Sequence, residues 1–442
     1  MVALHLAETL PPEQNVLLCE RDTFACGAAY ATGHAGHLLN VRAANMSAFP
    51  DQPAHFSDWL ETVRWECPEQ MQETEAGLFA SRGLYRRYLC SLLDRAVAGV
   101  PGRLGKLAAE IVDIERDGGA WRLHTAGGAS YRVAAVVLAI GNLPPAAPEN
   151  RLHRTDPWAS GTTKGLRPDL PVLVLGTGMT MVDLLLELRA AGFPGPVIAV
   201  SRRGLLPHRH AATRPWATPE MSDTERGSLA LLLGRVRWEV QRAAARGVDW
   251  RGVLDSLRPI TAAIWRSLSP ADRNRFLRHL RPYWDVHRHR LAAPVAEQMA
   301  EMLASGYLQV RRGRLTGMNF AEDRVEALIR PHGKPAPEPL LVQRVISATG
   351  LQSAADADSP LVRALCRRGL ARLDPWSFGL DVTETLEVRD SGGRVAGGLW
   401  ALGPIVRGVF WECIAVPDVR VQAQTVARRI GEAIGGAAAR AA

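Results

Sequence analysis

The stretch from Pro171 to Arg203, PVLVLGTGMTMVDLLLELRAAGFPGPVIAVSRR, decides the fold. Apolar residues at 172–175 lead directly into a GTG turn, a helical apolar pattern follows, and a second apolar run covers 196–200. In a βαβ unit of this kind, the first glycine allows the tight turn, and the second lets the backbone approach a pyrophosphate on the helix N-terminus. We therefore predict a dinucleotide site whose first contacts are Gly176, Thr177, Gly178 and Met179.

Two departures from the dinucleotide fingerprint refine this prediction. Met181 occupies the third glycine position, so helix and strand cannot pack as closely as in the strict motif. The second strand ends in Ser201-Arg202-Arg203, where an NAD site would place an acidic residue for the ribose. Guanidinium groups pair bidentately with a 2′-phosphate, so we expect NADP(H) rather than NAD(H). The alternative is an ordinary strand-to-helix turn followed by a solvated arginine pair.

The composition is that of a globular protein with two or three domains. The chain has 442 residues, of which 47% are apolar and 22% are charged. No apolar run reaches the ~18 residues of a membrane span, and the N-terminus lacks the features of a signal peptide. The net charge of +8 permits nucleic-acid binding, but no basic stripe is interleaved with aromatic residues. We expect a small-molecule substrate and neither a nucleic-acid nor a membrane partner; the oligomeric state stays open.

The six cysteines are scattered along the chain without a CxxC pair. This pattern favours a reducing, cytoplasmic location, and it argues against both a zinc site and a redox-active dithiol. We therefore expect no metal ligands, and a disulfide reductase is disfavoured.

The N-terminal region has the pattern of the second half of another βαβ unit. Residues 1–10 form an amphipathic helical pattern, and a strand at 16–19 ends in Glu20, where such units hold an adenine ribose. The preceding strand and glycine turn, which normally occupy the middle of the sheet, are absent from the sequence. We favour a true start upstream of Met1, because the later pattern is intact; a domain that lacks this strand is the alternative.

The remaining elements alternate in a coarse α/β order. We expect a ligand-wrapping loop at 26–60, a helix at 78–98, an antiparallel meander at 111–133 and a buried parallel strand at 134–140. Residues 203–306 are expected to be mostly helical, and further strands are expected at 308–311, 325–329, 341–346 and 399–402, before a final helix at 416–434.

These motifs, in this order, resemble the FAD/NAD(P)-binding flavoproteins with two dinucleotide sites, relatives of the flavin-containing and N-hydroxylating monooxygenases. The motifs that follow Glu20 are GAAYAT (27–32), HLLNV (37–41), MSA (46–48), AIGN (139–142), GTGMTMVD (176–183), SRRG (201–204), WDVHRHR (284–290), SATG (347–350), ALGP (401–404) and FWE (410–412). They cover nearly the whole chain and are specific for the family rather than for a substrate.

The resemblance implies an α/β fold of two Rossmann-like dinucleotide-binding domains, with the NADP domain nested within the FAD domain. The FAD domain would use residues 1–150 and 351–442. The NADP(H) domain would use 165–345, with a helical insertion at about 205–305. Gly141 and Gly350 would mark the crossovers between the domains. Gly403 stands where many such proteins carry an acidic residue beside the flavin, so backbone N–H groups would have to make the contacts to the flavin there.

Several side chains of the FAD half carry both a functional and a purely structural interpretation. Glu20 would accept a ribose hydroxyl or end a strand in solvent. His37 and Asn40 would contact the flavin or form hydrogen bonds within their loop. Arg82, one helical turn from Arg86, would meet a pyrophosphate or form a solvated face.

Two later motifs also allow both a functional and a structural interpretation. Trp411 and Glu412 would line the flavin or belong to the core. In WDVHRHR, Asp285, His287 and His289 would organise the nicotinamide or substrate side, or the segment would begin a helix with Asp285 near its cap. A metal role for the two histidines fits poorly, because side chains two positions apart on a helix diverge.

The predicted cofactor-binding set combines both sites, and no catalytic side chain is assigned. Its members are Glu20, His37, Asn40, Arg82, Gly141, Gly176, Thr177, Gly178, Met179, Ser201, Arg202, Arg203, Gly350, Gly403 and Trp411.

The function implied is that of an NADPH-dependent FAD oxidoreductase, monooxygenase-like, that passes hydride from NADPH to FAD and then to oxygen or a small-molecule acceptor. In such enzymes the flavin carries the chemistry, and the protein binds, orients and excludes water. The alternative is a non-catalytic NADP(H)-binding sensor or scaffold with a degenerate FAD site, which the missing first glycine turn keeps open.

Overall fold

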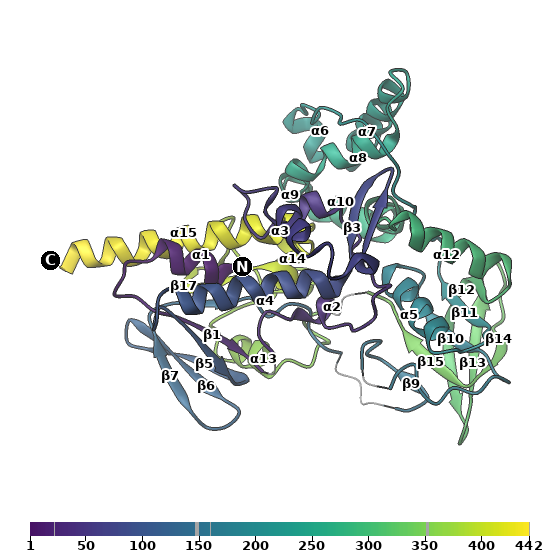
Figure 1. The fold of residues 1–442 in the computed structure, drawn as a ribbon, viewed down its shortest axis with the longest axis horizontal. Coiled ribbons are helices and arrows are strands. Elements are labelled where there is room, and N and C mark those ends of the chain that lie inside the picture. Colours follow the sequence, from purple (N-terminus) through teal and green to yellow (C-terminus); the bar gives the residue numbers. More distant parts are fainter. Residues whose placement is uncertain (22, 146–149, 160, 351–352, 442) are drawn as a thin grey trace.

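The computed structural model describes residues 1–21, 23–145, 150–159, 161–350 and 353–441. Its helices and strands form an α/β structure, as the sequence predicts, with one large sheet at one end and the long C-terminal helix at the other (Figure 1). Within these residues, no helix is long and apolar enough to cross a membrane.

The large sheet has seven strands and is built around the βαβ unit. The strands that flank the GTG turn lie next to each other and pair in parallel, with Val172 opposite Val197. Across the sheet the order is β14 (Glu338–Val342), β13 (Val325–Pro331), β12 (Leu308–Phe320), β11 (Val197–Ser201), β10 (Val172–Leu175), β15 (Arg344–Ser347) and β9 (His153–Arg154).

Both faces of this sheet are covered, which explains the continuous apolar runs of its central strands. Helices α5 (Met179–Ala190) and α12 (Ala293–Ala304) share one apolar core with alternate residues of β10 and β11. The opposite face forms a second core around Leu173 and Ile198, closed by the antiparallel strands β13 and β14. The buried sheet therefore holds the GTG turn rigidly at its edge.

The strands of the part predicted to bind FAD form smaller, separate sheets. Its parallel pairs are β1 (Val16–Glu20) with β4 (Leu104–Ala108), and β8 (Val136–Leu138) with β17 (Val395–Ala401). The antiparallel partners are β16 (Glu387–Arg389) beside β17, the meander β5 (Ile111–Asp117), β6 (Ala120–Thr125) and β7 (Ser130–Val133), and the hairpin β2 (Met71–Thr74) and β3 (Gly77–Ala80).

No strand among the described residues joins the β1–β4 pair to the sheet that holds β8. Leu17 of β1 is 41% exposed, which is unusual for a leucine of a central parallel strand. The β1–β4 pair therefore forms a separate two-stranded sheet among the described residues.

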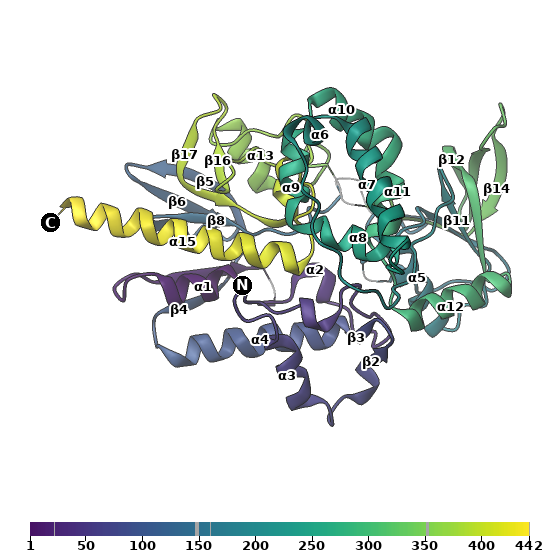
Figure 2. The ribbon, with the colours of Figure 1, turned by 90° about the horizontal axis from the view of Figure 1, so that it is seen from above.

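Helices surround these small sheets. The N-terminal helix α1 (Val2–Thr9) packs along the C-terminal helix α15 (Val416–Ala441), whose far end extends beyond α1 (Figure 2). The other helical segments of this half are α2 (Gly27–Tyr30), η1 (Ala43–Asn45), α3 (His55–Val63), η2 (Pro68–Gln70), α4 (Arg82–Gly99), α13 (Pro360–Arg367), η4 (Gly403–Val406) and α14 (Arg407–Phe410).

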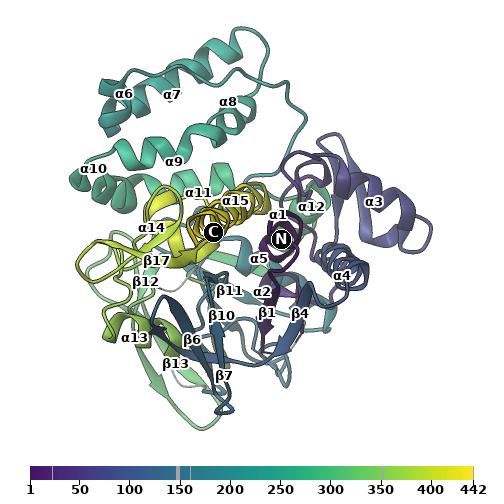
Figure 3. The same cartoon turned by 90° about the vertical axis from the view of Figure 1, so that its left-hand side faces the viewer.

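The helical insertion forms a layer of its own above both halves (Figure 3). It follows β11 and returns to the large sheet through α12. Its helices are α6 (Asp223–Gly227), α7 (Leu229–Ala244), α8 (Trp250–Ser256), α9 (Arg258–Ser267), α10 (Pro270–Arg275), the π-helical turn η3 (Phe276–Leu280) and α11 (Arg281–Arg288).

Several predicted boundaries are wrong for local reasons. The helix expected from residue 78 begins at Arg82, because Gly77 turns a hairpin at φ +114° and Ser81 Oγ caps the helix by accepting from the Leu84 N–H. The strand expected at 341–346 is two strands that turn at Gln343, whose buried amide bonds to Arg167. Residues 205–222, expected to be mostly helical, hold no helix, and three prolines lie among them.

We predict that Arg103→Met lowers the free energy of unfolding by about 2–4 kcal/mol, because a buried guanidinium holds the end of α1. Arg103 is 8% exposed, and its Nε donates to the Ala7 carbonyl at 3.1 Å. Its other nitrogens donate to the carbonyls of Leu10, Pro11 and Gln14. Urea denaturation measures the change.

The control is Arg95→Met, because Arg95 is exposed and, among the described residues, its side chain bonds only to the Ser91 carbonyl of α4. This variant should change the free energy by less than about 0.5 kcal/mol. Equal effects of the two substitutions would show that Arg103 does not anchor α1.

Candidate cofactor site

The GTG turn needs its two glycines for different reasons. Gly176 has φ +114°, and a Cβ there would lie 2.2 Å from the carbonyl oxygen of Ala348, just beyond β15. Gly178 is the N-cap of α5, and a Cβ there would meet no described atom within 4 Å. The first glycine therefore permits close packing of two strand ends. The second leaves open space before the helix N-terminus, which favours an anion.

Thr177 connects this turn to the end of β11 by hydrogen bonds. Its Oγ1 donates to the carbonyl of Leu205 at 2.6 Å and lies 2.9 Å from Oγ of Ser201. The same Ser201 oxygen accepts from the backbone N–H of Gly204 at 3.0 Å. The structure thus brings two predicted residues together, and their hydroxyls hold the loop that follows the strand.

The two arginines that end β11 differ in their surroundings. Arg203 lies over the ring of Tyr283 at 5.1 Å, and its Nη2 donates to the carbonyl of His279 at 3.2 Å. Arg202 is exposed, and its side chain makes no hydrogen bond or ion pair with any residue that the structure describes. Arg203 is therefore oriented by α11, whereas the Arg202 guanidinium is free to meet an anion.

His37 and Arg82, the residues expected on the flavin side, both contact α5 in the other half of the chain. Arg82 Nη2 donates to Oδ2 of Asp183 at 2.8 Å, and the two side chains are only 12% and 8% exposed. His37 Nε2 donates to the Asp183 carbonyl at 3.0 Å, so Nδ1 accepts from the hydroxyl of Thr32 at 2.7 Å. The solvated-face alternative for Arg82 is therefore wrong; its pyrophosphate role stays a prediction. Arg86 is half-buried on the same helix.

Asp183 is a buried carboxylate whose charge depends on these partners. Burial raises its pKa, while the positive charges of Arg82 and His37 act in the opposite direction. Burial likewise lowers the pKa of His37. The Arg82 guanidinium, rather than His37, therefore supplies most of the positive charge that neutralises the Asp183 carboxylate.

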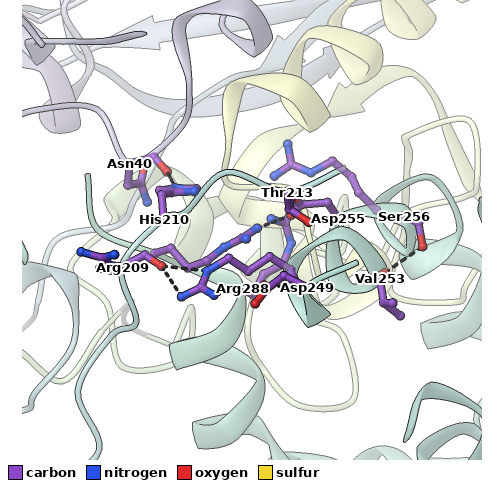
Figure 4. A network of polar contacts seen from close by, with 12 residues as sticks. Asn40, Arg209, His210, Thr213, Asp249, Val253, Asp255, Ser256 and Arg288 are labelled. Carbon is purple, nitrogen blue, oxygen red and sulfur yellow. Dashed lines mark hydrogen bonds and ion pairs between the residues drawn. The ribbon is translucent and has the colours of Figure 1, made fainter. Parts of the chain in front are cut away.

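Asn40 joins the N-terminal half to the helical insertion (Figure 4). Its backbone carbonyl accepts from Nε2 of His210 at 3.1 Å. His210 is 6% exposed, and its Nδ1 is buried without a hydrogen-bond partner among the described residues. Asn40 also lines a small cavity of about 10 Å³ together with Met179, another predicted residue. The HLLN loop therefore lies against the first turn of α5.

Buried charged side chains lie near His210 within the insertion. Arg290, 1% exposed, pairs with Asp255, and Arg288 Nε lies 3.8 Å from Oε2 of Glu412. Trp284 Nε1 donates to the other oxygen of Glu412 at 2.7 Å. Burial opposes ionisation of Glu412, but neighbouring positive groups outweigh it and lower its pKa. Glu412 therefore anchors α11 of the insertion to the C-terminal part.

The predicted crossover at Gly350 lies beside this junction. A Cβ on Gly350 would lie 3.9 Å from Nη2 of Arg281, and the Arg281 guanidinium is 5.8 Å from the ring of Trp411. Trp411 has φ +60°, which is rare for a large residue. Its indole stacks on Trp265 at 4.8 Å, and the Trp265 Nε1 donates to the carbonyl of Gly408 at 2.8 Å.

The other predicted FAD residues lie at strand ends. Glu20 Oε1 accepts from the N–H of Ala25 at 3.0 Å, and burial lowers the pKa of the nearby Met1 amino group to about 6, against the charge of Glu20. The N-terminal end of α1 therefore faces the end of β1. A Cβ on Gly141 or Gly403 would meet no described atom within 4 Å, so open space lies before both residues.

WDVHRHR lies at the C-terminal end of α11, so the alternative in which it begins a helix with Asp285 near its cap is wrong. Asp285 pairs with Arg281 at 3.3 Å, within the helix. His287 contacts the ring of His208 at a centroid distance of 4.5 Å, with the two rings tilted by 54°. His289 follows the helix as its C-cap and helps to lower the pKa of Glu412.

Sequence reasoning missed the residues that join distant segments. Asp183 closes the GTGMTMVD motif, so its position after a glycine turn was a usable signal. His210, Arg281 and Tyr283 carry no signal of their own, because their partners lie about 70 to 170 residues away along the chain.

We predict that His210→Asn weakens the acid sensitivity of the fold. Burial and the charge of Arg290 lower the pKa of His210 to about 4, so between about pH 4 and 6.5 the unfolded state binds more protons. Protonation of His210 should therefore cost the wild type up to about 3 kcal/mol as the pH falls through this window. The variant lacks this group, so its stability should fall by that much less, while other buried histidines such as His37 still titrate. Thermal unfolding at several pH values measures the difference.

The control is His279→Asn, since His279 is exposed. It should leave the pH profile unchanged. If His210→Asn leaves the pH dependence of thermal unfolding unchanged, His210 is not buried in its neutral form.

Comparisons with known proteins agree with this geometry. Residues 1–143 match a family described as FAD-NAD(P)-binding. No curated protein sequence matches the chain. One solved structure of similar fold is ornithine N-hydroxylase from Kutzneria sp. 744 with reduced FAD, NADP⁺ and L-ornithine; its TM-score is 0.63 and its identity 13%, over 98% of this chain and 96% of that one. Another is ornithine hydroxylase from Pseudomonas aeruginosa, with a TM-score of 0.62 and 13% identity over 98% of this chain and 97% of that one.

L-lysine 6-monooxygenase from Pseudomonas syringae is similar at a TM-score of 0.60 and 15% identity, over 95% of this chain and 100% of that one. These identities are low, so the likeness concerns the fold. The expected resemblance is confirmed at the level of fold: the α/β fold of the chain is similar to that of the N-hydroxylating monooxygenases above, and its first 143 residues match the FAD-NAD(P)-binding family.

Proposed function

We propose that the protein is an NADPH-dependent FAD oxidoreductase of the monooxygenase type, acting on a small molecule. The observation that carries this proposal is the meeting of both halves at Arg281, which lies between Gly350 of the NADP side and Trp411 of the C-terminal FAD part. A nicotinamide and a flavin held from these two sides would lie close together. The chemistry supplied by the bound cofactors would be hydride transfer from NADPH to FAD and reduction of oxygen or another acceptor.

The residues around the GTG turn fit NADP(H). Gly178 leaves open space at the N-terminus of α5, where backbone N–H groups and the helix dipole favour a pyrophosphate. Arg202 offers an unpaired guanidinium at the strand end that would carry the 2′-phosphate. In this proposal Arg203 acts through its stacking on Tyr283, which fixes the direction of the strand end.

The residues at the other strand ends fit FAD. Glu20 keeps one carboxylate oxygen for a ribose, and the nearby N-terminus of α1 suits a pyrophosphate. Gly141 and Gly403 leave room for close approach of the cofactor. Trp411 would shield the ring system from water, and the partners of Glu412 would hold that loop in place.

The alternative function is non-catalytic binding of NADP(H). The observation that favours it is the division of the FAD half into separate sheets, because β1 and β8 have no common neighbour among the described strands. A flavin site built on two unconnected strand ends would be weaker than one on a continuous sheet.

We predict that the purified full chain, mixed with FAD and then desalted, keeps a yellow flavin spectrum. NADPH should bleach it under anaerobic conditions faster than NADH does, because the strand end of β11 is basic. Absorption spectroscopy in a stopped-flow instrument measures both rates. A colourless protein that still binds NADP⁺ in calorimetry would support the alternative instead.

We predict that Arg202→Gln weakens NADP⁺ binding by about tenfold, since one charge-assisted contact to the 2′-phosphate is lost. NAD⁺ binding should stay the same, because NAD⁺ lacks that phosphate. Isothermal titration calorimetry with both nucleotides gives the two dissociation constants. Arg330→Gln, on the exposed side of β13, is the matched control and should change neither. Equal weakening of NAD⁺ and NADP⁺ binding would contradict the assigned role.

A further inference from the structure

A groove in the helical insertion is used by neither proposed nucleotide site. It lies between the extended segment 214–220 and helix α7, and its cavity volume is about 600 Å³. We call it the Arg–Trp groove. The lining residues that matter are Arg214, Trp216, Arg235, Glu239, Arg242 and Arg246.

One wall of the groove is held in place by the chain itself. A Cβ on Gly252 would lie 2.6 Å from the carbonyl oxygen of Arg214, so only glycine allows the segment to approach α8 this closely. Thr218 Oγ1 donates to the Ser256 carbonyl at 3.1 Å. Trp216 Nε1 donates to Oε2 of Glu239 at 3.0 Å. The groove is therefore formed before any ligand enters, which lowers the ordering cost of binding.

The charges of the groove are unbalanced. Glu239, 2% exposed, is shared by Arg235 at 3.1 Å and Arg242 at 3.3 Å. The Arg246 guanidinium has no hydrogen bond or ion pair within the described ranges, and Arg214 donates only to a backbone carbonyl. Four arginines and two carboxylates, those of Glu220 and Glu239, line the groove. Arg235 also pairs with Glu225 at 3.4 Å, just outside the lining, so an excess of one positive charge remains.

The groove also offers a flat aromatic surface. The half-buried indole of Trp216 lies 5.8 Å from the Arg242 guanidinium and 5.6 Å from that of Arg246. Beside it, Trp238 is 46% exposed, with Arg242 over its ring at 4.3 Å. Indole and guanidinium planes both stack on flat rings, and guanidinium also pairs with carboxylates.

We propose that the Arg–Trp groove is a second ligand site that binds a small planar aromatic carboxylate. The ring stacks on Trp216, and one or two carboxylate groups pair with Arg246 and Arg214. This class matches both the flat wall and the charge excess, whereas a neutral ring or an aliphatic diacid matches only one of them.

The test is calorimetric titration of the full chain with naphthalene-2,6-dicarboxylate, with FAD and NADP⁺ present to occupy the nucleotide sites. We expect saturable, sub-millimolar binding of one molecule per chain. Neutral 2-naphthol and non-aromatic succinate should each bind at least about tenfold more weakly.

Arg246→Gln should weaken binding of the dicarboxylate by about tenfold, because one charge-assisted contact is lost. Arg237→Gln is the matched control: Arg237 is an exposed residue of α7 that does not line the groove. Arg214→Gln provides a second variant, and neither lining variant removes a partner of Glu239. Absence of saturable binding would overturn the proposal. Binding that both lining variants leave intact, or that Arg237→Gln weakens equally, would do the same.

Discussion

A buried carboxylate, Asp183, is the constraint on which the relation of the two halves depends. Its charge is compensated by Arg82 of α4, from a segment about 100 residues earlier, while His37 holds the carbonyl of the same residue. Breaking a buried pair by removing one partner typically costs about 3–5 kcal/mol, because the remaining charge is left without compensation. The helix that follows the GTG turn therefore cannot move without the HLLN loop and α4.

The helical insertion adds a second set of connections between the halves. It leaves the large sheet after β11, yet its main polar contacts reach the FAD half: His210 bonds to Asn40, Trp265 to Gly408 and Trp284 to Glu412. In each, a side-chain nitrogen of the insertion donates to an acceptor outside the insertion. The insertion therefore fixes the loop around Trp411, where both proposed cofactors would meet.

Local pattern was enough to predict the βαβ unit, the meander and the α/β class, because each depends on neighbours in sequence. The glycine turn is an example, since Gly176 and Gly178 serve local backbone needs. Contacts between distant segments were not predictable. Arg82 had the pattern of a solvated or phosphate-binding side chain, and only the fold shows its pairing with Asp183. The turn at Gln343 was missed because its amide bonds to a residue more than 170 positions away.

The attachment of the insertion has a mechanical consequence. The insertion is covalently part of one half and hydrogen-bonded to the other, so it holds the two halves in one orientation. Rotation of one half against the other would break the hydrogen bonds of Trp265 and Trp284 together. Such a frame resists swivelling and permits only small sliding movements. Entry and exit of small molecules would then depend on movements of exposed side chains at the proposed nucleotide site, such as Arg202, rather than on separation of the two halves.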